Sequence, residues 1–258
     1  MTMCMRDKTT DPRKHGLAAV LAVLALVFVS SGLAGAVDFW VAATDAAVAT
    51  NNDCGYIASV HGAAAIRRSF HNENETVAAH VADRVNSGDE LVAPSGARIE
   101  MASGNNVILV VGSGGRARLS GLRSFLDPSG RTVTRLDLDV VSGEVRVQVR
   151  LNEQKPDAVL AGLNGADVLV RRGDAVLQSG ESWRVSVVAG EVRGRNRRSG
   201  VTGAPFTLSP MQVAGGNGAE NLPEQALRGI VERLPFSFES MRAALPPMPS
   251  LGWQLEAP

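Results

Sequence analysis

Apolar and polar residues alternate along much of the chain between Tyr56 and Arg195. The clearest run is 143–150, in which three valines alternate with charged or amide side chains. Successive side chains of a β-strand point to opposite faces, so this spacing predicts a strand with one buried face and one solvated face. The same spacing predicts strands at 97–101, 133–140 and 183–187.

A continuous apolar run at 107–111 predicts one strand that is buried on both faces. Gly, Asn, Asp and Ser separate the runs at short intervals, as turns between strands require. Two faint repeats, 85–91 with 170–176 and 142–146 with 189–193, indicate one architecture copied twice, unless they are chance similarities between hairpins. The predicted fold class is therefore all-β, either an elongated β-sandwich or a short β-solenoid.

A basic segment and then an apolar one precede this region. Residues 1–16 carry four Lys or Arg against two Asp, and 17–37 is uncharged. Because basic residues resist translocation, everything after the apolar segment is expected to be exported. The segment 17–37 is long enough to stay as a membrane anchor, and the small residues ending at Ala36 equally fit cleavage of a signal peptide. The third alternative is a buried helix of a soluble protein, for which the sequence offers no matching helical bundle.

Composition narrows the function classes. Lys plus Arg and Asp plus Glu each number 26, so the formal net charge is zero and nucleic acid is not an expected partner. Aromatic residues make up only 4% of the chain, so aliphatic side chains must fill the core. Cys4 and Cys54 lie on opposite sides of the apolar segment, which excludes a useful disulfide between them. Cys54 is expected to be a free thiol, with pairing between molecules as the alternative.

The β region resembles the FecR domain family over residues 56–213. The family pattern joins a short opening strand, a Gly-Asp turn, a strand after a small-residue turn and a Gly-containing strand pair before the closing strands. The segments that carry the resemblance are 57–62, 65–67, 87–91, 97–101, 106–109, 136–138, 143–145, 185–192 and 208–212. The resemblance implies an all-β, non-catalytic periplasmic domain.

Founding members of that family sense iron–siderophore uptake and signal to a sigma factor through a cytoplasmic helical domain. Residues 1–16 are too few to fold such a domain, and 214–258 offers no separate one. The resemblance therefore implies the periplasmic module alone, which binds a protein or another partner in the cell envelope.

The sequence contains no established catalytic motif. The segment 107–117 imitates the strand and glycine turn of a dinucleotide site, but 116–124 lacks the helix that such a site requires. One group of ligand-type side chains has no zinc-site spacing and is expected to lie in or beside a polar loop at 70–76. Its members are His61, His71, Glu73, Glu75 and His80. We therefore expect no catalytic, cofactor or metal site.

The candidate site residues form a basic run near the end of the β region. They are Arg193, Arg195, Arg197 and Arg198. One interpretation is a contact surface for an anionic wall polymer or lipid head groups. The other is the edge strand of a soluble sheet, protected from aggregation by its charge.

The composition changes after Arg198, where Gly and Pro between 200 and 218 predict a linker. The next segment, 223–234, has helical spacing of its apolar residues, with Asn221 as the candidate cap. Its apolar face consists of Leu227, Ile230, Val231 and Leu234. This helix either packs back on the β region or docks a partner. A second short segment, 238–245, leads into a Pro-rich tail.

The sequence thus predicts four segments. They are a cytoplasmic tail or signal-peptide start at 1–16, an anchor or signal peptide at 17–37, a FecR-like β domain at 56–213, and a linker, amphipathic helix and Pro-rich tail at 214–258. We expect a periplasmic location, with the inner membrane as a contact if the leader is retained. The expected function is interaction or sensing in the bacterial cell envelope, with a wall polymer or glycan as the alternative partner to an envelope protein.

Overall fold

The structure is a computed structural model that describes residues 49–70, 73–104, 106–126, 132–150, 157–198, 201–216 and 218–235. The predicted segments 1–16 and 17–37, the short segment 238–245 and the Pro-rich tail lie outside these ranges. Within them, no helix is both long and apolar enough to cross a membrane.

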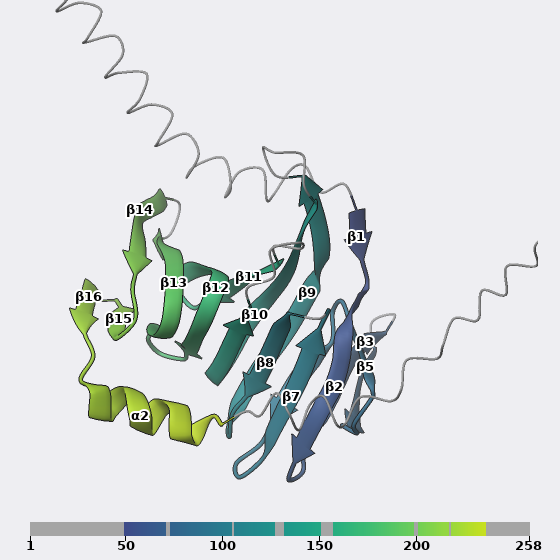
Figure 1. Ribbon diagram of the computed structural model, residues 1–258. Coiled ribbons are helices and arrows are strands. Elements are labelled where there is room, and N and C mark those ends of the chain that lie inside the picture. The colour runs from purple at the N-terminus through teal and green to yellow at the C-terminus, as the bar shows by residue number, and fades with distance from the viewer. Residues whose placement is uncertain are drawn as a thin grey trace, which may run out of the picture. The chain divides into compact units, whose positions relative to one another are not determined.

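Strands make up most of the described chain (Figure 1). The first eight are short: β1 (Ala49–Asn51), β2 (Asp53–His61), β3 (Ala65–Phe70), β4 (Glu73–Ala78), β5 (Arg84–Asn86), β6 (Glu90–Ala93), β7 (Arg98–Ser103) and β8 (Val107–Val111). The others include four long ones: β9 (Gly115–Leu126), β10 (Thr132–Val149), β11 (Asp157–Leu163), β12 (Ala166–Ser179), β13 (Arg184–Arg198), β14 (Val201–Leu208), β15 (Gln212–Gly215) and β16 (Gly218–Asn221). One helix, α2 (Glu224–Arg233), follows them in the described part.

Hydrogen bonds join all sixteen described strands into one continuous sheet, which confirms the predicted all-β class. The main path runs β16-β15-β13-β12-β11-β10-β8-β7-β2-β5, and the remaining strands pair beside it. The pairing of β10 with β11 is parallel, whereas the other described pairings are antiparallel. The observed form is therefore a single sheet rather than two separate ones.

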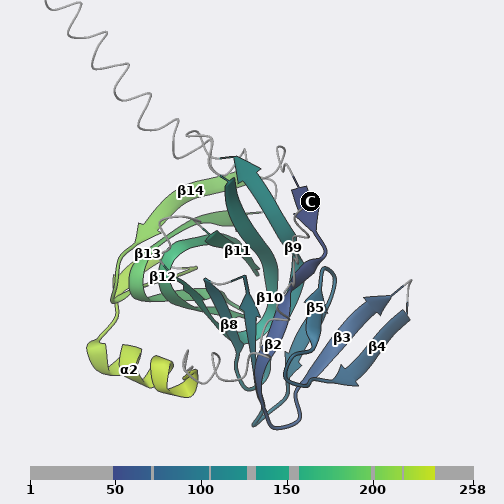
Figure 2. The same cartoon turned by 45° about the vertical axis from the view of Figure 1, so that its right-hand side comes forward.

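The long strands change neighbours along their length. The first part of β10, up to Val140, pairs with β9 and β11, and its second part, from Gly143, pairs with β8 and β12. β12 exchanges β11 for β10 in the same way, and β13 exchanges β15 for β14. Figure 2 shows β11 to β14 curving as nested arcs beside β10. These strands carry the sheet from one layer into the other.

We call these layers the helix-side layer and the far layer. The helix-side layer contains β2, β5, β7, β8, β15, β16 and the adjoining parts of the long strands. The far layer contains β1, β3, β4, β6, β9, β11, β14 and the other parts of the long strands. They enclose one aliphatic core, in which Ile57 and Leu109 of the first layer meet Ile66 and Leu119 of the second. All four side chains are fully buried.

β8 is buried on both faces, as its apolar run predicts. Val107, Leu109 and Val111 enter the common core. Ile108 and Val110 point the other way and belong to a second apolar cluster on the outer face of the helix-side layer. This second cluster is the reason that the strand has no polar positions.

Glycines occupy the places where the long strands turn between the layers. Gly173 has a φ of +133° and Gly190 a φ of +78°. A Cβ on Gly190 would lie 2.7 Å from the Cα of Gly173, and a Cβ on Gly143 would lie equally close to the Cα of Gly115. Because positive φ strains residues with a side chain and no space exists for one, these positions require glycine.

The sequence predicts a break between the runs 133–140 and 143–150 and a turn at Gly173-Asp174, and both predictions are wrong. Gly143 follows the alternating run 133–140, but both lie in the single strand β10. The dipeptide Gly173-Asp174 likewise lies inside β12. A bend within a strand requires the same positive φ as a turn. The glycine therefore indicates a change of direction at this position, but the strand continues through it.

Two segments expected to be irregular also form strands. The predicted loop at 70–76 lies in the hairpin of β3 and β4, where Arg68 pairs with Glu75. The predicted linker between 200 and 218 contributes β14 and β15, which both pair with β13, and leads into β16. These strands are short or rich in polar and small residues, so backbone pairing defines them more than an apolar pattern does.

The C-terminal helix packs back on the sheet, which is one of its two predicted alternatives. Leu234, directly after α2, is buried, and its carbonyl accepts a hydrogen bond from Nη1 of Arg146 at 2.7 Å. Arg233 forms an ion pair with Glu144 of β10 at 3.0 Å. Pro223 precedes the helix and no side chain caps it, so the predicted cap at Asn221 is wrong.

Replacing Gly173 by alanine tests the close approach of β12 and β13. Gly173→Ala should lower the free energy of unfolding by about 3 kcal/mol, because the new Cβ would clash with the carbonyl oxygen of Ala189 at a positive φ. Urea unfolding measures this change. Gly180→Ala is the control, since no atom lies within 4 Å of its Cβ position, and it should change stability by less than about 1 kcal/mol. Equal unfolding midpoints for the two variants would contradict the constraint.

Candidate functional site

The candidate arginines lie on the second part of β13, between β12 and β14. This part of the strand is paired on both sides, so the interpretation as a charge-protected sheet edge is wrong. Arg193, Arg195 and Arg197 alternate with smaller residues and share the outer face of the far layer, since Val192 enters the core. For Arg198 the structure describes the backbone only.

A buried carboxylate engages two of these arginines. Asp167 of β12 is 3% exposed and lies opposite Arg195 in the strand register. It accepts a hydrogen bond from Nε of Arg195 at 2.9 Å and also forms an ion pair with Arg197. The hydrogen bond from Arg197 to Asp167 raises the pKa of Arg197, and the nearby charges of Asp167 and Asp139 add to the rise. Both arginines thus share one carboxylate within the sheet.

Arg193 instead lines a hollow on the outer surface, together with Arg171 and Arg172 of β12. The hollow has a volume of about 450 Å³ and is completed by Leu169, Gly190 and Glu191. Arg193 donates a hydrogen bond to Glu191 at 2.8 Å, and both side chains are about half exposed. We call this site the arginine hollow. Its described lining contains three arginines and one glutamate.

A β-bulge brings two consecutive arginines to this hollow. In a regular strand, Arg171 and Arg172 would point to opposite faces. The register of β12 against β13 shifts between Val170 and Arg172, which leaves one extra residue in β12. The bulge lies directly before Gly173, and such an insertion redirects the side chains beside it.

The basic run in the sequence identifies Arg193, but side-chain periodicity does not reveal that Arg171 and Arg172 join it. Alternation assumes one residue per position in the ladder, so it fails wherever an extra residue is inserted. A signal is nevertheless present, because two charged residues in succession, followed by Gly-Asp, interrupt the apolar run that begins at Val168. In a strand that is buried on one face, such a pair indicates a bulge.

The chemistry of the arginine hollow favours an anion. Guanidinium groups present a planar fork of N–H donors that matches carboxylate and phosphate oxygens in pairs. Leu169 is 3% exposed and lies at the base of the site, so part of the lining is apolar. The arrangement suits a carboxylate or phosphate that is attached to an apolar or sugar-like group.

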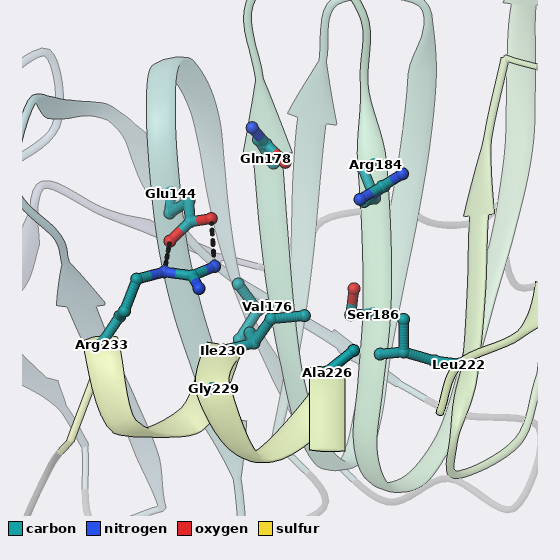
Figure 3. Close-up of a pocket in the computed structure, with 10 residues that line it drawn as sticks. All are labelled: Glu144, Val176, Gln178, Arg184, Ser186, Leu222, Ala226, Gly229, Ile230 and Arg233. Atoms are coloured by element: carbon teal, nitrogen blue, oxygen red, sulfur yellow. Dashed lines mark hydrogen bonds and ion pairs between the residues drawn. The ribbon is translucent and has the colours of Figure 1, made fainter. Parts of the chain in front are cut away.

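A second hollow, also of about 450 Å³, lies between α2 and the helix-side layer (Figure 3). Figure 3 shows Arg233 reaching from the helix to Glu144, with Ile230 beside Val176. The other residues that line this second hollow are Gln178, Arg184, Ser186, Leu222, Ala226 and Gly229. In this hollow, Glu144 already pairs with Arg233.

Other sequence features do not form sites in the described part of the chain. The turn after β8 leads directly into strand β9, so the helix that a dinucleotide site needs is not there. His61 and His80 are exposed, and no group of three or more potential metal ligands occurs among the described residues. Ser59 lies 3.3 Å from the ring of His61, but nothing activates this pair further.

Cys54 is a free thiol, as predicted, and it is completely buried. Burial, with the nearby charges of Asp53, Asp89 and Asp137, raises its pKa to about 12. Pairing between native molecules, the predicted alternative, therefore has no accessible sulfur in this structure.

The thiol of Cys54 should react only when the protein unfolds. In a Cys4→Ser background at pH 8, only on the order of one thiol in ten thousand is ionised in the folded protein, so a thiol reagent should label it slowly. Its folded pKa exceeds the ordinary value of 9.0, so stability should decline as the pH rises above 9.0. Absorbance-monitored labelling with and without urea measures the contrast. Native labelling at the rate of a small free thiol would contradict it.

Comparisons with known proteins give a limited result. No family model matches the chain, and no curated protein is similar to it. Two crystal structures of a candidate anti-sigma factor from Parabacteroides distasonis align with 18% identity and TM-scores of 0.41 and 0.39. Each alignment covers 55% of this chain, and it covers 64% and 63% of the two neighbours. This chain therefore spans less than two thirds of the neighbours' length.

Proposed function

We propose that this chain is an exported, non-catalytic interaction module of the bacterial cell envelope, of the FecR-like type. Its partner is an envelope protein, and the arginine hollow receives an acidic group of that protein. The observation that carries the proposal is the gathering of Arg171, Arg172 and Arg193 around one hollow, where Glu191 is the one carboxylate among the described lining residues.

The charge pattern of the described sheet supports the choice of this hollow. Four other arginines of the far layer pair with carboxylates that lie within the sheet. Arg116 and Arg118 both pair with Glu90, and Arg195 and Arg197 both pair with Asp167. In such a pair, N–H donors of the guanidinium group are already engaged by a carboxylate of the same sheet. In the arginine hollow, three arginines lie beside Glu191, which pairs with Arg193.

The export of the module is supported by the sequence. Four basic residues precede the uncharged segment 17–37, and this order directs the β region across the membrane. The module then resides in the periplasm, either anchored by 17–37 or released by cleavage after Ala36. A sensing role follows if the partner's occupancy of the arginine hollow changes with conditions in the envelope.

A wall polymer or glycan is the second candidate partner. The same hollow favours it, since anionic polymers display carboxylate or phosphate groups next to sugar rings, and the hollow combines guanidinium groups with the apolar Leu169. The two candidates differ in the ligand, not in the contact residues.

A binding experiment with matched charge changes tests the proposal. The probe is a fluorescent oligoglutamate peptide at low salt, and purified peptidoglycan in a sedimentation assay is the second probe. The double variant R171A/R172A should bind the peptide at least about tenfold more weakly, because it loses two charge-assisted contacts. The control R67A/R84A removes two exposed positive charges elsewhere and should bind nearly as well as the unchanged chain.

The two probes separate the outcomes. Hollow-dependent binding of the peptide supports an acidic protein partner, whereas hollow-dependent sedimentation with peptidoglycan alone supports the polymer. Binding that the control variant weakens as much as R171A/R172A would show that only net charge matters and would overturn the site. The absence of binding to either probe would overturn the proposed function.

A further inference from the structure

The outer face of the helix-side layer carries side chains that are buried although they point away from the core. Ala58 of β2, Ala102 of β7 and Ile108 and Val110 of β8 are between 0% and 6% exposed. They form a cluster separate from the common core. We call these four residues the apolar strip. Outward side chains of a two-layer sheet are buried only where another part of the structure covers them.

The helix α2 covers one end of the apolar strip. Leu234 belongs to the same cluster, and its Cδ2 lies so close to Gly112, just beyond β8, that a Cβ there would clash. Ile230 packs against the cluster from the helix. Ala58, however, lies on β2, two strands and roughly 10 Å away from β8 across the sheet. A leucine side chain held at Gly112 cannot reach that far.

Polar atoms beside the strip also lack partners. Glu100 is 2% exposed and pairs with Ser59 of β2 and Val110 of β8, and Ala58 lies at the β-bulge directly before Ser59. Its Oε1 pairs with Arg98 at 3.2 Å, but its buried Oε2 has no hydrogen-bond partner, and neither has Oε1 of Gln148. Burial raises the pKa of Glu100, and Arg98 offsets only part of the rise. A covering segment with free backbone N–H groups would supply the missing donors.

We propose that residues 236–258 of this chain lie across the apolar strip and continue the cover that Leu234 begins. This segment follows Pro235 immediately, so it starts at the edge of the strip. It contains eight large apolar side chains and only three charged ones. The large apolar residues are Phe236, Phe238, Met241, Leu245, Met248, Leu251, Trp253 and Leu255.

Position and reach select this occupant over the N-terminal part of the chain. β1, the first described strand, pairs with β9 in the far layer, whereas Pro235, the last described residue, directly follows Leu234 of the cluster. The span from Gly112 to Ala58 requires only about 4 extended residues at roughly 3.3 Å each. The proline residues at 246, 247 and 249 favour an extended course and leave other backbone donors free for Glu100 and Gln148.

Cysteine accessibility tests the proposal independently of the arginine hollow. In a Cys4→Ser background, A102C should be protected from a maleimide in the full chain. In a chain ending at Pro235 it should react at least about tenfold faster, because the cover is missing. The control S95C, in an exposed turn, should react equally in both chains. Equal labelling of A102C in both chains would overturn the proposal.

If the shortened chain does not fold, its Cys54 will be labelled by the maleimide. A second measurement on the full chain then tests the proposal. Tyr56, at the margin of the cluster, is replaced in the full chain by the photoreactive p-benzoylphenylalanine. After irradiation, peptide mapping should find crosslinks from position 56 to residues 236–258 of the same molecule. Crosslinks to residues 1–48, crosslinks to a second copy, or none beyond neighbouring strands would each overturn the proposal.

Discussion

The close approach of backbones at the sheet bends is the constraint on which the rest of the structure depends. Gly173 and Gly190 touch where β12 and β13 turn from one layer to the other, and Gly143 touches Gly115 in the same way beside β10. Only glycine permits this contact at positive φ. Without these bends, the long strands could not change partners, and one sheet could not enclose the aliphatic core on both sides.

The bulge that forms the arginine hollow adjoins the bend at Gly173. The extra residue of this bulge also places Arg171 and Arg172 at the same hollow. The irregularity beside the bend of β12 therefore also shapes the arginine hollow. Arg116 and Arg118 instead pair with Glu90, and Arg195 and Arg197 pair with Asp167, within the far layer itself. The arginines proposed to bind a partner are therefore different residues from those that pair within the sheet, even where both kinds lie on the same strand.

Much of the fold could be predicted from the sequence, because side-chain alternation reports directly which face of a strand is buried. The runs 107–111 and 143–150 are identified for this reason. Strands with few apolar residues, such as β4 and β14, escape prediction because backbone pairing defines them. Arg193 is identified by its charge, but its partners in the hollow depend on a bulge that periodicity cannot represent. Asp167 is 28 residues before Arg195, and only the register brings them together.

The sharing of β10 between both layers has a consequence for how the chain folds. Neither layer has a complete ladder without this strand, so neither is expected to persist as an independent folding unit. Several of its pairings also join distant parts of the chain, as between Glu144 and Gln178, and such topologies fold slowly because loops must close before contacts form. Under the proposed export, this slow step would fall after translocation, and a late-forming central strand would leave both unfinished layers open to aggregation.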